Sequence, residues 1–219
     1  MRASPKIIEL QKLLAEKYPQ LPKAAASAVS TGEERWDTAL RGGLRKGAVT
    51  EVIAAHPGAG TALLLGALFA ASVAAGRWVA LIDARDSFDA EWLGDTHDFS
   101  RFLWVRCPDA ALAVKAADLL LRDGNIGTVV LDLRLNPRAQ LRKIQPQVWY
   151  RLQRLVEESA AVLLVATPFR TVSSAKVQFI LHGRWTLDAL ETPQSALLPA
   201  AEFSVEGLSA VEHHELKAG

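Results

Sequence analysis

Five short apolar segments alternate with amphipathic segments along most of the chain. The apolar segments are 49–54, 78–83, 102–106, 128–133 and 162–167. Between them, 110–122 and 147–159 place apolar residues at the spacing of a helix. Apolar runs without alternation are typical of strands that are buried on both faces. The pattern therefore predicts an α/β fold in which a mainly parallel, twisted sheet is flanked by helices on both sides.

The N-terminal segment has a different character. A stretch over 5–17 carries four apolar residues at helical spacing, which form one stripe of an amphipathic helix. These residues are Ile7, Leu10, Leu13 and Leu14. Residues 18–32 then have the composition of a linker, so we divide the chain into an N-terminal helix and linker, 1–28, and a core domain, 29–219. The stripe either packs on this protein's own core or docks on another copy or a partner.

Two further segments near the C-terminus, 177–187 and 202–206, have strand character with no helical segment between them. Antiparallel neighbours need only a short connection, whereas parallel neighbours need a longer crossover. We therefore expect antiparallel strands at the C-terminal edge of the sheet.

Composition indicates a single cytoplasmic domain. Half of the 219 residues are hydrophobic, which is enough for a substantial interior, and the formal net charge is +1. The single cysteine, Cys107, cannot form an internal disulfide; we expect it to be a buried small residue in a reducing compartment. The apolar run 62–75 is too short to span a bilayer, and the N-terminus has no signal-peptide pattern. We expect no membrane segment.

A Pro- and Gly-rich turn follows the first core strand and leads into an apolar helix, as in a phosphate-binding loop. On the motif G-x-x-x-x-G-K-[S/T], Ala55 replaces the first glycine and Gly60 fits. Thr61 replaces the lysine and Ala62 replaces the magnesium-binding hydroxyl. Each lost contact involves a charged group and is worth about 1.5–3 kcal/mol, so nucleotide binding should weaken by about a hundredfold or more. Gly58 and Gly60 still allow backbone N–H groups to face an anion; the alternative is an ordinary tight turn.

Segments on both sides of this loop extend the pattern. They are 30–32 (Ser-Thr-Gly), 36–47, 81–89, 129–132 and 163–170. Through them the chain resembles the ATPase core of the bacterial RecA recombinases over about 29–208. The resemblance implies that 129–132 is the Walker B strand, which ends at Asp132. It places Arg85 where the recombinases carry their catalytic glutamate, and Pro168 where they carry a nucleotide-sensing glutamine.

These replacements predict a core that does not hydrolyse ATP, without catalytic residues or a bound metal, and with weak or absent ATP binding. Arg85 cannot accept a proton from water as a general base must. Asp132 is kept, but without a metal it needs another partner if it is buried, because an unpaired buried carboxylate is costly. We expect Arg85 or another basic side chain to pair with Asp132 or Asp83. The alternative is an ordinary surface ion pair of Arg85 with Asp86, Asp83 or Glu51.

Basic residues follow the Walker B strand and the last core strand. The candidates for contacts with DNA or a protein partner are Arg134, Arg138, Arg142, Lys143 and Arg170. Basic side chains along one face neutralise phosphates, although a solvated surface explains the same pattern. The segment 171–174 is too short to be the recombinases' second DNA loop. Trp149 and Tyr150 lie among the arginines, but their helical spacing favours core packing.

A RecA-like core that lacks its ATPase residues and its second DNA loop resembles the ImuA family, also labelled SulA-like. The resemblance implies an accessory protein of SOS-induced translesion DNA synthesis, which acts in a mutasome and binds RecA, the ImuB polymerase homologue, or both. Two alternatives stay open: a weak DNA-dependent ATPase completed by a neighbouring subunit, and a SulA-type division inhibitor that binds FtsZ. Single-stranded DNA is a candidate ligand, and the N-terminal helix is a candidate surface for self-association.

Overall fold

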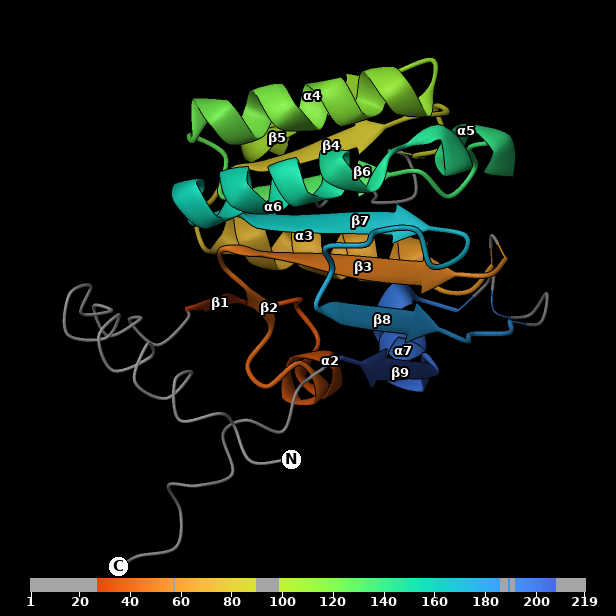
Figure 1. Cartoon of the computed structure of the whole chain (residues 1–219). Helices are drawn as coiled ribbons and strands as arrows, with labels where there is room; N and C mark the ends of the chain where they lie inside the picture. The colour runs from red at the N-terminus through yellow and green to blue at the C-terminus, as the bar shows by residue number, and fades with distance from the viewer. Residues whose placement is uncertain (1–26, 57, 90–98, 186–188, 190–191, 208–219) are drawn as a thin grey trace, which may run out of the picture.

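A computed structural model describes residues 27–56, 58–89, 99–185, 189 and 192–207. Seven strands form one sheet in the order β5-β4-β6-β7-β3-β8-β9, with helices on both of its faces (Figure 1). A second, two-stranded sheet pairs β1 with β2 beside β3. The predicted α/β fold with a mainly parallel sheet is confirmed.

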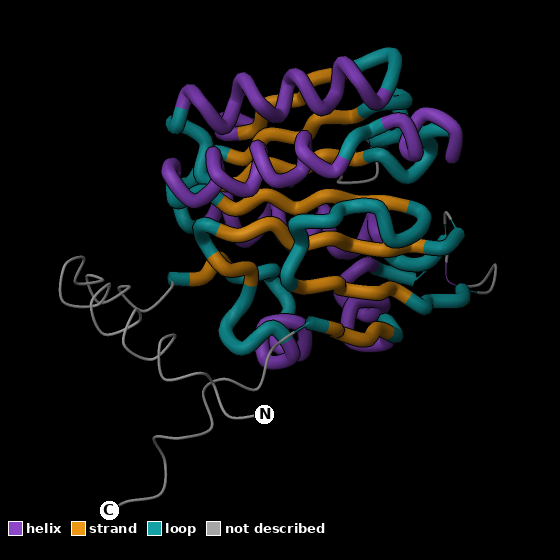
Figure 2. The backbone as a smooth tube through the Cα atoms, viewed as in Figure 1, coloured by secondary structure: helices purple, strands orange, loops and turns teal. Residues whose placement is uncertain are grey.

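The elements closely follow the hydrophobic pattern (Figure 2). The strands are β1 (Ala28–Val29), β2 (Leu44–Arg45), β3 (Ala48–Ala54), β4 (Val79–Asp83), β5 (Phe102–Arg106), β6 (Thr128–Asp132), β7 (Val162–Thr167), β8 (Val177–Leu181) and β9 (Phe203–Glu206). The helices are α2 (Glu34–Ala39), α3 (Thr61–Ala74), α4 (Ala110–Asp123), α5 (Arg138–Lys143), α6 (Pro146–Ser159) and α7 (Gln194–Leu197), with short 3-10 turns η2 (Phe99–Arg101) and η4 (Leu198–Ala200). Strands β3 to β7 and helices α4 and α6 begin and end within one residue of their predicted positions.

The C-terminal strands differ in part from the expectation. The pair β8–β9 is antiparallel, as predicted, but β8 joins β3 in the parallel direction. For β8 to be parallel, the connection 168–176 must return from the end of β7 to the opposite edge of the sheet. Nine extended residues reach about 30 Å, which exceeds the roughly 20 Å length of a six-residue strand. Helix α7 also lies between β8 and β9, where no helix was expected.

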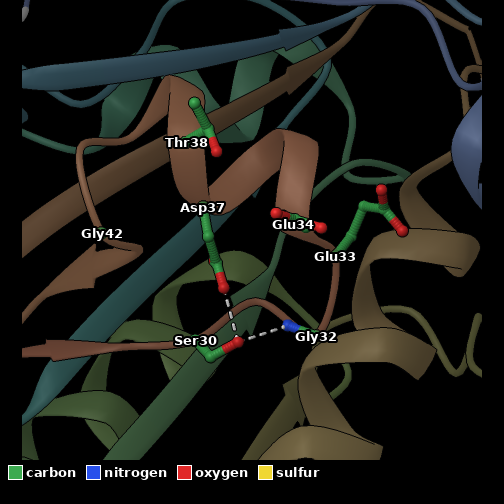
Figure 3. Close-up of a pocket in the computed structure, with 7 residues that line it drawn as sticks. All are labelled: Ser30, Gly32, Glu33, Glu34, Asp37, Thr38 and Gly42. Carbon is green, nitrogen blue, oxygen red and sulfur yellow. Dashed lines mark hydrogen bonds between the residues drawn. The ribbon is translucent and has the colours of Figure 1, made fainter.

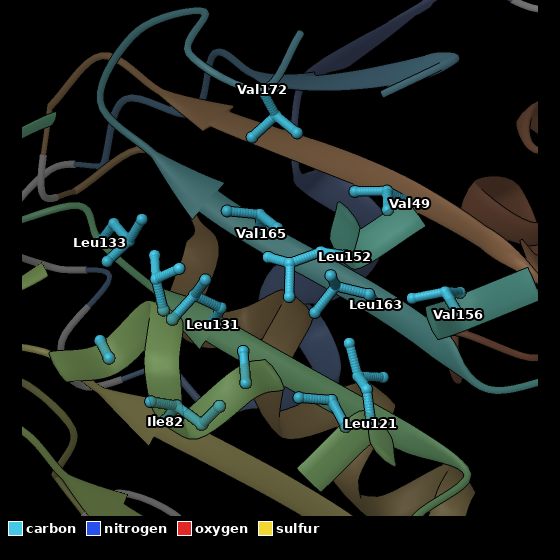
Figure 4. Close-up of a cluster of buried hydrophobic side chains, with 14 of the residues drawn as sticks. Val49, Ile82, Leu121, Leu131, Leu133, Leu152, Val156, Leu163, Val165 and Val172 are labelled. Atoms are coloured by element: carbon cyan, nitrogen blue, oxygen red, sulfur yellow. The ribbon is translucent and has the colours of Figure 1, made fainter. Parts of the chain in front are cut away.

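The parallel strands bury both of their faces. On one face, Ile82, Leu131 and Val165 belong to a buried cluster with Leu121 of α4 and Leu152 of α6 (Figure 4). On the other face, a second cluster joins strand residues to the apolar helix α3. Burial on both faces explains why these strands show no polar alternation. No helix within the described ranges is long and apolar enough to cross a membrane.

Two predictions of buried residues hold only in part. Trp149 is 1% exposed and lies in the core, but Tyr150 is 56% exposed, so its predicted core position is wrong. The buried stripe of α6 consists of Trp149, Leu152, Gln153, Leu155 and Val156, and Tyr150 lies outside it. Cys107 is only partly buried. Burial, followed by the charges of Asp109 and Asp83, raises the pKa of its thiol.

The segment before β2 forms a turn that is held by one carboxylate (Figure 3). Asp37 accepts hydrogen bonds from the Thr31 backbone N–H at 2.8 Å, from Thr31 Oγ1 at 2.7 Å and from Ser30 Oγ at 2.5 Å. Part of the predicted linker therefore has a defined structure, which includes β1 and this turn. The predicted helix over 5–17 and its apolar stripe lie outside the described residues.

Gly32 brings this turn against helix α3, and its replacement tests that contact. Its φ is +88°, and a Cβ atom there would lie 2.4 Å from the carbonyl oxygen of Ala67. We expect Gly32→Ala to lower the free energy of unfolding by about 2–4 kcal/mol, since backbone strain of about 1 kcal/mol is joined by a clash with backbone atoms. Gly124→Ala is the matched control, because Gly124 has φ +74° and open space around its Cβ position. Equal losses in urea unfolding would show that the contact with α3 contributes nothing.

Candidate functional site

The carboxyl ends of the parallel strands bring several predicted site residues to one edge of the sheet. Asp83 at the end of β4 is directly paired in register with Asp132 at the end of β6. Asp83 is fully buried and Asp132 is 3% exposed. The turn that precedes α3 lies at the same edge, where β3 ends, although β7 separates β3 from β6. This edge corresponds to the predicted nucleotide site.

Asp132 has a basic partner, and that partner is Arg134. The guanidinium donates from Nη2 to Oδ2 at 2.7 Å and from Nε to Oδ1 at 3.0 Å. The backbone N–H of Arg134 also donates to Oδ1 at 3.0 Å. The two side chains are only 12% and 2% exposed, so this ion pair is largely shielded from water. The hypothesis that a basic side chain compensates Asp132 is confirmed, with Arg134 in that role.

Asp83 is compensated in a different way, by the loop that follows it. Its carboxylate accepts backbone N–H bonds from Arg85 at 3.2 Å, Ser87 at 2.8 Å and Phe88 at 2.8 Å. The Ser87 hydroxyl lies 3.3 Å from both Asp83 and Asp132 and links the two. Asp83 therefore needs no cation.

Arg85 takes no part in this site through its side chain. The side chain is exposed and forms no ion pair with the described residues, so the pairings of Arg85 itself with Asp132, Asp83, Asp86 or Glu51 are wrong. Asp86, its neighbour, instead pairs with Arg106 at 3.6 Å. The physical reason is the tight turn after β4, in which Asp86 has a left-handed φ of +54° and the backbone of Arg85, not its guanidinium, faces Asp83.

Among the described residues of the turn before α3, the exposed His56 is the only basic side chain, and no lysine or arginine is present to hold a phosphate. Gly60 has φ +105° and begins the helix, and Thr61 is fully buried with no hydrogen-bond partner for its Oγ1 among the described residues. Ala62 and Ala55 are exposed. A Cβ atom on Gly183 would lie 2.8 Å from the carbonyl oxygen of Ala59, so the segment after β8 lies directly against this turn.

These residues do not fit a magnesium–nucleotide complex held by Asp132. A magnesium ion requires carboxylate or other oxygen ligands at 2.0–2.1 Å, but the Arg134 guanidinium is bound to both carboxylate oxygens of Asp132. No lysine replaces Thr61 nearby, since the chain has none between Lys46 and Lys115. Across the described ranges, no three His, Cys, Asp or Glu side chains come together as a metal-binding group.

Glu51 is a site residue that the sequence analysis missed as such. It lies in β3, fully buried, and one oxygen accepts bonds from Thr167 Oγ1 at 3.0 Å and from the backbone N–H groups of Thr171 at 2.6 Å and Val172 at 3.0 Å. Its other oxygen has no partner among the described residues. Burial raises the pKa of this carboxyl, and the hydrogen bonds only partly oppose that effect. The available signal was a lone acidic residue inside an apolar strand.

Glu51 and several other residues hold the loop after β7. By resemblance to the recombinases, this loop lies where their second DNA loop follows the strand. Arg170 pairs with Glu206 of β9, and Phe169 lies under the guanidinium of Arg138 at 4.7 Å. Ser174 Oγ donates to the Trp149 carbonyl at 3.0 Å. The loop is therefore attached to the body of the protein along its length.

Three of the five basic residues that we predicted to contact DNA or a partner are engaged in contacts within the chain. Arg134, Arg138 and Arg170 are engaged with Asp132, with a phenyl ring and with Glu206, respectively. Arg142 and Lys143 are exposed at the end of α5, and neither forms an ion pair with the described residues. The structure therefore does not present the five residues as one row of free cations.

Comparisons with known proteins support a RecA-like core. The chain is 36% identical to the RecA protein of Frankia alni over 118 residues, which are 52% of this chain and 34% of that protein. It is 34% identical to RecA of Clavibacter michiganensis over 123 residues and 35% identical to RecA of Acinetobacter baylyi over 121, with 54% and 53% of this chain covered and 34% of each RecA. The chain thus spans about a third of the length of these relatives. No family model matches it.

The ion pair between Asp132 and Arg134 should contribute strongly to stability. We expect Arg134→Ala to lower the free energy of unfolding by about 2–4 kcal/mol, because it leaves a buried carboxylate without its cation. Adding Asp132→Asn should recover part of this loss, which gives a coupling free energy above about 1 kcal/mol in a double-mutant cycle. Arg138→Ala, which removes only a ring contact, should cost about 1 kcal/mol or less. Additive effects of the two substitutions would contradict the pairing.

Glu51 should impose a pH dependence on stability. Because burial raises its pKa, the folded state keeps the proton to a higher pH than the unfolded chain does. The stabilising contribution of Glu51 is full below its ordinary pKa of about 4.3 and falls as the pH rises through the raised folded value. Glu51→Gln cannot titrate, so its unfolding free energy should not show this fall.

Urea unfolding at a series of pH values from about 4 to neutral would measure the difference. Glu158→Gln, an exposed site on α6, is the control and should keep the wild-type slope. Parallel pH profiles for the wild type and Glu51→Gln would refute the assignment.

Proposed function

We propose that this protein is a non-catalytic RecA-like accessory protein of SOS-induced translesion DNA synthesis. It acts as a mutasome adaptor that binds RecA, an ImuB-type polymerase homologue, or both. The observation that carries the proposal is the bidentate ion pair between Arg134 and Asp132. The guanidinium of Arg134 binds the carboxylate with which a RecA-type ATPase would hold its metal. Its positive charge is permanent and comes from the same chain.

Three further features support an adaptor over an enzyme. The position of the phosphate-binding lysine holds the buried, neutral Thr61, and the position of the general base holds an exposed arginine. The loop after β7 is tied to Glu51 and Glu206 instead of being free to follow DNA. The RecA-like sheet and the helices that cover it are retained, and their surfaces can bind a protein partner without hydrolysis of ATP. The assignment to translesion synthesis rests on the resemblance to the ImuA family.

ATP turnover is the direct test of the non-catalytic part. We expect magnesium-dependent hydrolysis to match the buffer background, with or without single-stranded DNA, while RecA measured in parallel is active. Thr61→Lys with Ala62→Thr should restore nucleotide binding more than hydrolysis, because Arg134 and Arg85 remain. Hydrolysis that rises with DNA and disappears in Asp132→Ala would instead establish a working ATPase and reject the proposal.

Partner capture tests the adaptor part. Purified RecA, ImuB and FtsZ would each be offered to the immobilised full chain. We expect retention of RecA or ImuB and no retention of FtsZ. Retention of FtsZ alone would assign the protein to cell-division control, and retention of none of the three would reject the proposed partners.

A further inference from the structure

A groove of about 490 Å³ lies on the face of the sheet that α4 and α6 cover, between α4 and the α5–α6 pair. Aliphatic side chains of both walls line it, namely Ala111, Val114, Ile144 and Val148. Val114 is buried and Ile144 and Val148 are partly exposed, so the groove presents an apolar surface to solvent. Its volume falls within the roughly 300–1,000 Å³ of ligand pockets.

The rim of this groove is basic. Lys115 of α4, Lys143 of α5 and Arg151 of α6 stand around it. Arg151 is partly neutralised by Asp118 at 2.9 Å. Lys115 and Lys143 are exposed and form no ion pair with the described residues.

The lining holds one acidic residue, Asp109, against the three basic ones. Asp109 uses its carboxylate to cap α4, where it accepts the Leu112 N–H at 2.8 Å. Asp109 keeps its negative charge, but Lys115 and Lys143 outnumber it even when Arg151 is counted as paired with Asp118, so the lining has a positive balance above an apolar floor.

We infer that this groove binds an acidic amphipathic segment of a protein partner. Apolar side chains of the segment enter between α4 and α6, and its carboxylates meet Lys115 and Lys143. This arrangement is the helix-in-groove mode of recognition, in which an apolar stripe supplies affinity and flanking charges supply orientation. The inference deepens the proposed adaptor function, on which it rests, by naming the surface and the chemistry of what it captures.

The floor of the groove distinguishes a peptide from a nucleic acid. Binding of single strands relies on bases that stack on aromatic side chains, and none of the residues that line this groove is aromatic. A phosphodiester backbone would contact only the rim and leave the aliphatic floor exposed. An acidic peptide with aliphatic anchors uses both parts.

The inference can be tested with a labelled synthetic probe and the full chain. The probe is a helical peptide of about four turns with leucines at positions i, i+4 and i+7 and glutamates beside them. Two control peptides carry lysine in place of glutamate, or the same composition in scrambled order. In fluorescence anisotropy we expect the acidic probe to bind at least about tenfold more tightly than either control, and added salt to weaken it.

Variants then locate the binding. Lys115→Glu with Lys143→Glu should weaken the acidic probe by about tenfold or more, and Ala111→Trp, which fills the groove from an exposed position, should abolish binding. Arg154→Glu with Lys176→Glu makes the same change in net charge at exposed positions outside the groove and should have little effect. Thermal unfolding of each variant checks that it folds; if Ala111→Trp does not, the charge pair alone decides.

Three outcomes would overturn the inference. In the first, the acidic probe binds no more tightly than its scrambled control. In the second, the groove variants bind the probe as tightly as the wild type does. In the third, labelled oligo(dT) binds more tightly than the probe, and its binding is weakened equally by the substitutions at Lys115 and Lys143. The last result would make the groove a nucleic-acid surface. ATP turnover or a failed capture of RecA and ImuB would reject the proposed function while leaving the probe result intact, so the two failures are distinguishable.

Discussion

Buried carboxylates that have to be satisfied from within the chain shape the loops at this edge of the sheet. An uncompensated carboxylate in the interior costs several kcal/mol, so Asp132, Asp83 and Glu51 each require donors. Asp132 obtains a guanidinium, Asp83 the backbone N–H groups of its own loop, and Glu51 those of the loop after β7. The paths of these loops follow from where the donors must lie.

The same contacts satisfy the charged groups at this edge of the sheet from within the chain. In an ATPase of this architecture, a carboxylate at the strand end is balanced by a metal ion that arrives with its substrate. Here Arg134 supplies the balancing charge permanently, and the neutral Thr61 is buried at the start of α3. The sheet edge is thus complete on its own. The proposed partner surface lies elsewhere, on the face covered by α4 and α6, where Lys115 and Lys143 form no ion pair with the described residues.

Much of the fold could be predicted from the sequence because strands buried on both faces have to be apolar throughout. The need of Asp132 for a basic partner was equally predictable, but the identity of that partner was not. Arg85 and Arg134 each follow a strand-end aspartate by two residues, and only the turn geometry decides that one side chain folds back while the other points to solvent. The role of Glu51 depends on contacts with residues more than a hundred positions away in the sequence. The parallel direction of β8 depends on the connection that precedes it, which has no recognisable sequence pattern.

The attachment of the loop after β7 has a consequence for regulation. Ordering or release of a loop is a common means by which a bound ligand switches a protein between states. The loop after β7 is held by Glu51 on one side and by Glu206 on the other. If the protein acts without ATP turnover, as proposed, no hydrolysis step would end its action, and the extent of that action would be governed by how many copies the cell makes and how quickly it removes them.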